Sequence, residues 1–188
     1  MLDTYTLTTE ESARRDRQIE EQIAAMARGD VSGLGGLYEL IRADVYAYAL
    51  SKTGNRADAE DITHDTFVRI WQNAAAYTPQ GKPMAWILTV ELNLIRRAAG
   101  AGQKTVPLDT SVNRENGEDV SEAAIRNEFL REIMRVLTEE EREAVILHAV
   151  SGLKHREIAA MLGVPLSTVL SRYSRAIRKL QTIAKEGE

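Results

Sequence analysis

One stretch near the carboxyl end, residues 154–180, constrains the fold more than any other. Its apolar residues recur at helical spacing in two blocks. These are Ile158, Met161 and Leu162 in the first block, and Val169, Tyr173, Ile177 and Leu180 in the second. Gly163 lies between the blocks, where a left-handed backbone would be needed, and Pro165 suits the start of a helix. The pattern predicts two helices joined by a tight turn. This is the form of a helix-turn-helix, whose second helix enters the major groove of DNA.

The same stretch concentrates positive charge. Residues 154–181 hold six Lys and Arg against a single Glu, in a chain whose formal net charge is −4. A local basic face on an acidic protein is typical of a surface that contacts phosphates. The alternative is a helical hairpin whose basic face is only solvated. We favour DNA binding, and the side chains expected to contact DNA are Arg156, Ser167, Thr168, Ser171, Arg172, Arg175, Arg178 and Lys179.

These side chains differ in what they can recognise. Arg172 and Arg175 have the geometry to read guanine bidentately, and the Ser and Thr hydroxyls can read a base edge or a phosphate. Arg156, Arg178 and Lys179 are expected to hold phosphates, which carry no sequence information.

The composition excludes several other classes of protein. The chain has 188 residues, 44% of them hydrophobic, and no cysteine, so disulfides and thiolate metal sites are excluded. No apolar run approaches the roughly 20 residues of a membrane span. The amino-terminal residues do not resemble a secretory signal, so we expect a cytoplasmic protein. We expect His64, His148 and His155 to lie on separate helices and form no site. No nucleotide-binding loop or pair of catalytic carboxylates occurs, so we expect no enzymatic activity, cofactor or metal.

Helical periodicity dominates the rest of the chain. A first helix is expected to end at residue 29, and others to span about 31–52, 56–73, 84–98, 121–137 and 138–151. The last begins with a capping box of Thr138 and Glu141. Residues 99–120 contain glycine and proline and little periodicity, which is typical of a linker. The sequence therefore predicts an all-α fold of two helical domains, residues 1–98 and 121–188, joined by a flexible linker. The second domain contains the helix-turn-helix.

Two stretches resemble the extracytoplasmic-function sigma factors of bacterial RNA polymerase. Residues 56–97 (RADAEDITHDTFVRIWQNAAAYTPQGKPMAWILTVELNLIRR) are similar to domain two of that family, which melts the promoter. Residues 137–180 (LTEEEREAVILHAVSGLKHREIAAMLGVPLSTVLSRYSRAIRKL) are similar to domain four, whose helix-turn-helix reads the −35 element. The resemblance implies a factor that binds core RNA polymerase and recognises the −35 and −10 promoter elements. It further implies a factor that initiates transcription of a stress- or signal-responsive regulon.

The resemblance implies a polymerase contact on the helix expected at 56–73. Asp61 and Asp65 are four residues apart, so they share a face and repel mildly. In the family this face docks on the clamp helices of the polymerase β′ subunit, and the matching positions are Asp61, His64, Asp65 and Trp71. The family usually has Gln and Glu where this chain has His64 and Asp65. The alternative is a solvated acidic face near a helix start, with Trp71 in the core.

The resemblance also implies a site for the −10 element, where a flipped base is held in a pocket of domain two. Asn93 matches the family's asparagine near that pocket, and its amide can donate and accept. Tyr77 is a candidate for stacking on a base, and Lys82, Arg96 and Arg97 for holding phosphates. The alternatives are an Asn93 that bonds only backbone and a Tyr77 in the core.

Two positions depart from the family. Glu91 is expected beside the DNA path, where an acid would weaken attraction to phosphates. Leu170 stands where the family often has Lys, which removes one polar contact and offers an apolar surface for a thymine methyl group.

The implied partners are core RNA polymerase (the β′ clamp and the β flap), promoter DNA and an anti-sigma factor, which in the family is often anchored in the inner membrane. Two other functions stay open at this point. One is a helix-turn-helix regulator with an amino-terminal sensor domain, which would bind duplex DNA without polymerase. The other is a sigma-like protein that sequesters a partner and does not melt DNA.

Overall fold

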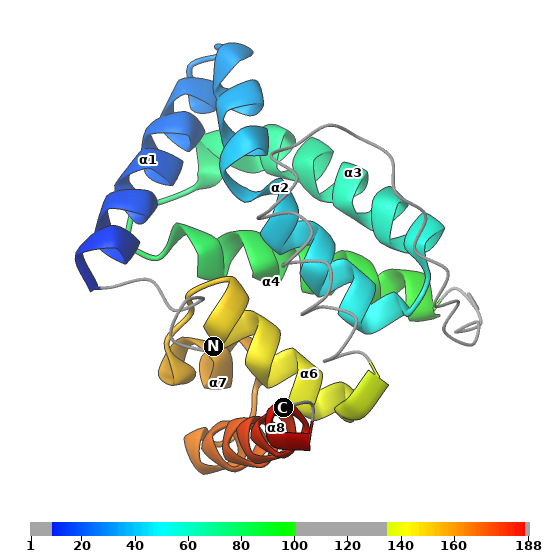
Figure 1. The fold of residues 1–188 in the computed structure, drawn as a ribbon. Coiled ribbons are helices and arrows are strands. Elements are labelled where there is room, and N and C mark those ends of the chain that lie inside the picture. The colour runs from blue at the N-terminus through cyan, green and yellow to red at the C-terminus, as the bar shows by residue number, and fades with distance from the viewer. Residues whose placement is uncertain (1–8, 101–134, 187–188) are drawn as a thin grey trace.

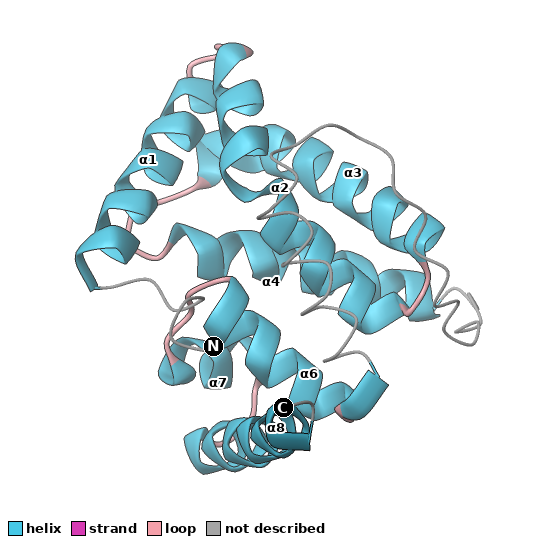
Figure 2. Ribbon diagram, in the orientation of Figure 1, coloured by secondary structure: helices cyan, strands magenta, loops and turns pink. Residues whose placement is uncertain are grey.

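The computed structural model describes residues 9–100 and 135–186, and every regular element in these two ranges is a helix (Figures 1 and 2). The amino-terminal part contains α1 (Thr9–Ala27), α2 (Ser32–Thr53), α3 (Arg56–Asn73) and α4 (Pro83–Gly100). A short 3₁₀ turn, Ala74–Ala76, follows α3. The all-α prediction is confirmed.

Local chemistry explains where these helices begin and end. Gly54 takes the left-handed conformation (φ 64°) and its N–H donates to the Leu50 carbonyl, which ends α2. Asn55 then accepts hydrogen bonds from the backbone N–H groups of Ala57 and Asp58, which starts α3. At the start of α2, a Cβ on Gly33 would lie 2.7 Å from the Gln22 carbonyl oxygen. The glycines there allow α1 and α2 to pack closely.

The carboxyl-terminal part contains α6 (Glu139–Val145), a π-helical segment (Ile146–Val150), α7 (His155–Leu162) and α8 (Leu166–Glu186). Thr138 and Glu141 form the expected capping box at the start of α6. Gly163 has φ 70° and donates to the Ala159 carbonyl, so α7 turns directly into α8. The helix-turn-helix predicted from residues 154–180 is therefore present.

The two parts pack on one another, with α6 against α2 and α7 against α4 (Figure 1). Tyr48 of α2 is fully buried and its hydroxyl donates to Glu143 Oε1 at 3.0 Å. Lys52 Nζ lies 2.8 Å from Glu139 Oε1 and 3.2 Å from Glu143 Oε1. The two parts thus share one hydrophobic core, joined at its edge by lysines of one part and glutamates of the other.

Two expectations lie largely outside the described residues. These are the linker at 99–120 and the helix at 121–137; α4 continues to Gly100, two residues past its expected end. Within the ranges that the structure describes, no helix is long and apolar enough to cross a membrane.

Candidate nucleic-acid interface

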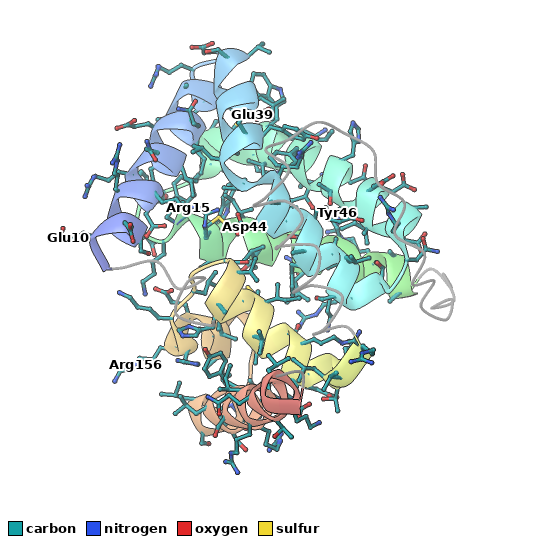
Figure 3. The ribbon with its side chains drawn as sticks, viewed as in Figure 1. Glu10, Arg15, Glu39, Asp44, Tyr46 and Arg156 are labelled. Atoms are coloured by element: carbon teal, nitrogen blue, oxygen red, sulfur yellow. The ribbon has the colours of Figure 1, made fainter. Side chains whose placement is uncertain are left out.

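Helix α8 presents one buried and one exposed face. Val169, Ala176 and Leu180 are buried against the other helices of the carboxyl-terminal part. The opposite face is exposed and carries Ser167, Leu170, Ser171, Ser174, Arg175, Arg178 and Lys179. Thr168 and Arg172 are half-buried at its edge. Arg156 of α7 is exposed and points away from the body of the molecule (Figure 3). The structure thus brings the predicted DNA-contacting side chains of α8 onto one face of that helix or its edge, and leaves Arg156 exposed on α7.

Glutamates of α6 lie beside the basic residues of α8. Glu141 Oε2 accepts from Lys179 Nζ at 2.7 Å, and Glu141 Oε1 lies 3.6 Å from Arg175 Nε. Burial acts to raise the pKa of Glu141, but the hydrogen bonds from Lys179 and the Thr138 N–H hold it below its usual value. Glu141 therefore fixes two cations whose side chains stay about half-exposed. Sequence reasoning found Glu141 only as a helix cap.

Hydroxyl groups orient two arginines of the same face. Arg175 Nη1 donates to Ser171 Oγ at 2.6 Å, and Arg178 Nη2 donates to Ser174 Oγ at 3.1 Å. Each pair is four residues apart, so both guanidinium groups lie along the helix axis rather than extending freely.

The three histidines lie on separate helical elements, as expected, but two of them are in contact. His148 and His155 stack with ring centroids 4.0 Å apart, and Tyr173 of α8 meets both edge-on at 4.8 and 4.9 Å. His148 Nδ1 lies 2.8 Å from the Leu153 carbonyl oxygen. Burial and the neighbouring His148 lower the pKa of His155. The rings meet because the chain folds back between the π-helical segment and α7. The spacing of the two histidines in the sequence does not show this.

This cluster supports α8 and gives no sign of being a metal site. No group of three or more His, Cys, Asp or Glu residues that could hold a metal ion occurs in the described ranges.

A hollow of about 310 Å³ lies between α3 and α4. Asn93 and Arg97 of α4 line it together with Trp86, and Arg69 and Asn73 of α3 close the other side. Asn73 Nδ2 donates to the Arg69 carbonyl at 2.7 Å, which fixes its amide. Asn93 is exposed, so its amide is open to a ligand.

Arg69, Asn73 and Trp86 were not predicted as site residues from the sequence. Arg69 and Asn73 are four residues apart on α3, and Trp86 and Asn93 are seven apart on α4. Each pair shares a helix face. That spacing in the sequence could have shown that each pair shares a helix face. Only the tertiary structure shows that the two faces lie against each other and form the hollow.

Tyr77 and Lys82 lie away from this hollow. Tyr77 packs on Trp86 at a ring-centroid distance of 4.8 Å, and its hydroxyl donates to Glu20 Oε1 of α1 at 3.0 Å. Burial, and then that hydrogen bond, raise the pKa of Tyr77. Lys82 Nζ lies 3.5 Å from Glu157 Oε1 of α7. Tyr77 therefore packs between elements, and Lys82 is exposed beside a glutamate of α7. Arg96 is also exposed, on α4.

The expectation that Glu91 lies beside the DNA path is wrong. Glu91 is fully buried in the face of α4 that packs within the core, together with Ile87, Leu88 and Leu92. Burial raises its pKa well above the usual value and Asp44 adds to the effect. Asn93, two residues on, faces outward. Because Glu91 is held inside, it does not repel DNA.

The acidic face of α3 is solvent-exposed. Asp61, His64 and Asp65 are all exposed, and His64 Nδ1 lies 3.8 Å from Asp65 Oδ1. Trp71 is half-buried and packs against the core.

Apolar groups border this acidic face. The exposed ones are Val68 of α3 and Tyr38 of α2, and the Tyr38 ring lies 4.9 Å from that of Phe67. Ile70, on the same helix as Val68, is fully buried.

The arrangement of α1 and α2 is fixed by charge as well as by packing. Arg15 pairs with Asp44 and also donates to the Leu40 carbonyl at 3.2 Å, and Figure 3 shows both charged side chains between the two helices. The pair is remote from the hollow and from α8, and we assign it a structural role.

Comparisons with known proteins match both parts of the chain. Residues 37–105 match the family model described as Sigma-70 region 2, and residues 128–180 match Sigma-70, region 4. The chain is 34% identical over 167 residues to the ECF RNA polymerase sigma factor SigE of Mycolicibacterium smegmatis, covering 82% of this chain and 64% of that protein. It is 28% identical to BldN of Streptomyces coelicolor, covering 90% and 66%, and 29% identical to SigL of Mycobacterium tuberculosis, covering 88% and 96%. The chain therefore spans about two thirds of the length of SigE and BldN.

Two solved structures share the fold. CnrH in complex with the cytosolic domain of CnrY aligns with a TM-score of 0.61 at 23% identity, over 90% of this chain and 98% of that chain. The sigma factor RpoE, in complex with the anti-sigma factor NepR from Bartonella quintana, aligns with a TM-score of 0.58 at 24% identity, over 79% and 94%. With both sigma-70 regions matched in order, the chain belongs to the extracytoplasmic-function sigma factors.

Proposed function

We propose that this chain directs core RNA polymerase to promoters by binding the −35 element through α8 and the −10 element through the hollow between α3 and α4. The observation that carries this proposal is the pairing of two sites, each on a region matched by a sigma-70 family model. One is the exposed basic face of a helix-turn-helix, and the other is a hollow with an exposed amide between arginines. The protein itself performs no catalytic step in this account.

The α8 face is suited to duplex DNA. Ser167 and Ser171 are exposed near the start of the second helix, where a helix-turn-helix contacts base edges, and Arg175 and Arg178 are exposed further along it. Arg175 and Arg178 are oriented by hydroxyl groups, and Lys179 by Glu141. Preset side chains lose less conformational entropy on binding.

The hollow is suited to a single unstacked base. Asn93 offers a donor and an acceptor for a base edge, and Trp86 gives the wall an aromatic ring. Arg69 and Arg97 lie where the phosphates of a strand entering the hollow would pass. The buried position of Glu91 removes one reason to expect weak melting, and we prefer a factor that melts promoters to a protein that only sequesters a partner.

The exposed face of α3 is suited to a basic partner, and we assign it to the β′ clamp. Reversing two charges tests this directly. Asp61→Lys with Asp65→Lys should abolish co-purification with core polymerase while the far-ultraviolet circular dichroism stays unchanged. The matched control reverses two exposed acids of α1, Glu10→Lys with Glu21→Lys, and should keep core binding. Equal retention of core by both double variants would refute the assignment.

An anti-sigma factor is the further partner that we propose. RpoE of Bartonella quintana was solved in complex with one. The exposed Val68 and Tyr38 beside the acidic face offer it an apolar contact. We expect a complex that buries more than about 1,200 Å² and that excludes core polymerase. A competition pull-down tests this: a ternary complex of the chain, the candidate partner and core would contradict it. Anchoring of this partner in the inner membrane stays a prediction.

A further inference from the structure

Leu170 is an apolar side chain in an otherwise polar row. Its side chain is 46% exposed to solvent. It is the one exposed large hydrophobic residue in the described part of α6, α7 and α8. Helical spacing places it beside Ser167, three residues before it, and Ser174, four residues after it. It therefore lies on the outward half of α8, whereas Val169 and Ala176 face the core.

Isolated exposed apolar residues are common on protein surfaces and need no explanation by themselves. The place of Leu170 is what gives it meaning. It lies in the second turn of the second helix of a helix-turn-helix, and residues near that helix start contact base edges in this motif. Its neighbours Ser167, Ser171 and Ser174 are short, so the leucine projects beyond them.

The arginines of this face start further along the helix but reach back toward Leu170. Arg175 is bound to Ser171, and Arg178 to Ser174. Leu170 is thus an apolar group among three serines, two of which hold a guanidinium group. A surface of that kind cannot bind phosphate at its apolar position, but it can enclose a methyl group.

We propose that Leu170 is a specificity residue that contacts the 5-methyl group of one thymine in the −35 element. Thymine is the one base that shows a methyl group in the major groove, and apolar contact is how proteins read it. This inference rests on the proposed function, since it requires α8 to lie in the groove. Loss of one buried methyl group should weaken binding about fourfold.

Deoxyuridine substitution tests the contact, since deoxyuridine keeps every hydrogen-bonding group of thymine and lacks only the methyl group. Duplexes are first enriched from a random library with the full chain bound to core polymerase. Each thymine of the enriched −35 element is then replaced singly by deoxyuridine. The wild-type complex should bind one of these duplexes about fourfold more weakly. Leu170→Ala should bind the thymine and deoxyuridine duplexes equally. Val31→Ala, which truncates another exposed apolar residue, should keep the fourfold difference.

Two results would overturn the role of Leu170 alone. Equal wild-type binding to every deoxyuridine duplex would show that no methyl group is read, and a fourfold difference retained by Leu170→Ala would assign the reading to another residue. If the wild-type complex enriches no duplex at all, the proposed function fails, and the role of Leu170 fails with it.

Discussion

At the scale of single residues, Glu91 is the most unusual feature of the molecule. Neither of its buried carboxyl oxygens has a hydrogen-bond partner in the part of the chain that the structure describes. Burial raises its pKa, Asp44 raises it further, and the Ala49 backbone amide offsets only part of the effect. A buried carboxyl in this setting takes up a proton instead of remaining charged.

Replacement of Glu91 should therefore stabilise the protein. In the native state Glu91 keeps its proton, whereas in the unfolded chain the carboxyl loses it above the usual pKa of about 4.5. The free energy of unfolding of the parent therefore falls as the pH rises above about 4.5. Glu91→Met should raise the free energy of unfolding by about 1–3 kcal/mol, with a larger gain at pH 8 than at pH 5. Urea unfolding at both pH values measures it. Glu21→Met, at an exposed site, should show no such difference, and a destabilised Glu91→Met at both pH values would contradict the account.

His155 makes stability depend on pH in the opposite direction. Its pKa is lowered in the native state, so the unfolded chain binds a proton first as the pH falls below about 6.5. The stability that neutral His155 contributes is complete above that pH and is lost as the pH falls toward the lowered value. His155→Phe keeps a ring against His148 and Tyr173 but cannot bind a proton.

The variant should therefore lose less stability than the parent between pH 7.5 and pH 5.5 in urea unfolding. His64→Phe, at an exposed histidine of α3, is the matched control and should follow the parent. Parallel curves for His155→Phe and the parent would show that His155 does not carry the effect.

At the scale of elements, the sequence predicted the helices well where local chemistry sets their ends. The end of α2 lies within one residue of the expectation and α3 starts where expected, because the Gly54 and Asn55 signals need no distant partner. The buried face of α4 was predicted less well. Helical spacing predicts an apolar stripe of Trp86, Ile87, Val90, Leu94 and Ile95. Ile87 is fully buried, but the other four are only half-buried.

The stripe that is buried on α4 includes Glu91, and an acid breaks the apolar pattern on which the prediction depends. The hollow and the histidine stack escaped prediction for another reason. Each joins two elements whose contact depends on the tertiary fold. Candidate residues were thus found where one helix supplies them, as with Asn93 and Arg97, and were missed where a second helix completes the site.

Two arginines of α8 should play different parts in DNA binding. Arg172→Ala should weaken binding by about 1–3 kcal/mol and relax preference at one base pair. Arg178→Ala should weaken binding to all sequences alike. It should also reduce the slope of the logarithm of the binding constant against the logarithm of the salt concentration by about one unit. Fluorescence anisotropy with a panel of duplexes at several salt concentrations separates the two. If the two variants bind every duplex identically, the proposal that Arg172 reads a base is refuted.

At the scale of the whole molecule, polar contacts hold the two parts together. Lys52 lies between Glu139 and Glu143, and Lys82 faces Glu157. Lys52→Glu should open this arrangement, because three carboxylates would then meet at a partly buried site. The chain has no cysteine, so Glu60→Cys with Gln181→Cys allows specific labelling of exposed sites in both parts.

Single-molecule energy transfer between these labels should be high in the parent and low after Lys52→Glu. Arg28→Glu, at an exposed site of α1–α2, should resemble the parent. Unchanged transfer in the Lys52→Glu protein would show that these ion pairs do not hold the parts together.

The central claim is that this chain gives core RNA polymerase the ability to recognise and open promoters. Run-off transcription by core enzyme on a library of genomic promoter fragments tests it most directly, with permanganate footprinting of the −10 region on the active fragments. The wild-type chain should produce specific transcripts and reactive thymines. Asn93→Ala should keep −35 binding but slow the appearance of those thymines. A wild-type chain that binds duplex DNA yet yields no promoter-specific transcript with core enzyme would contradict the account.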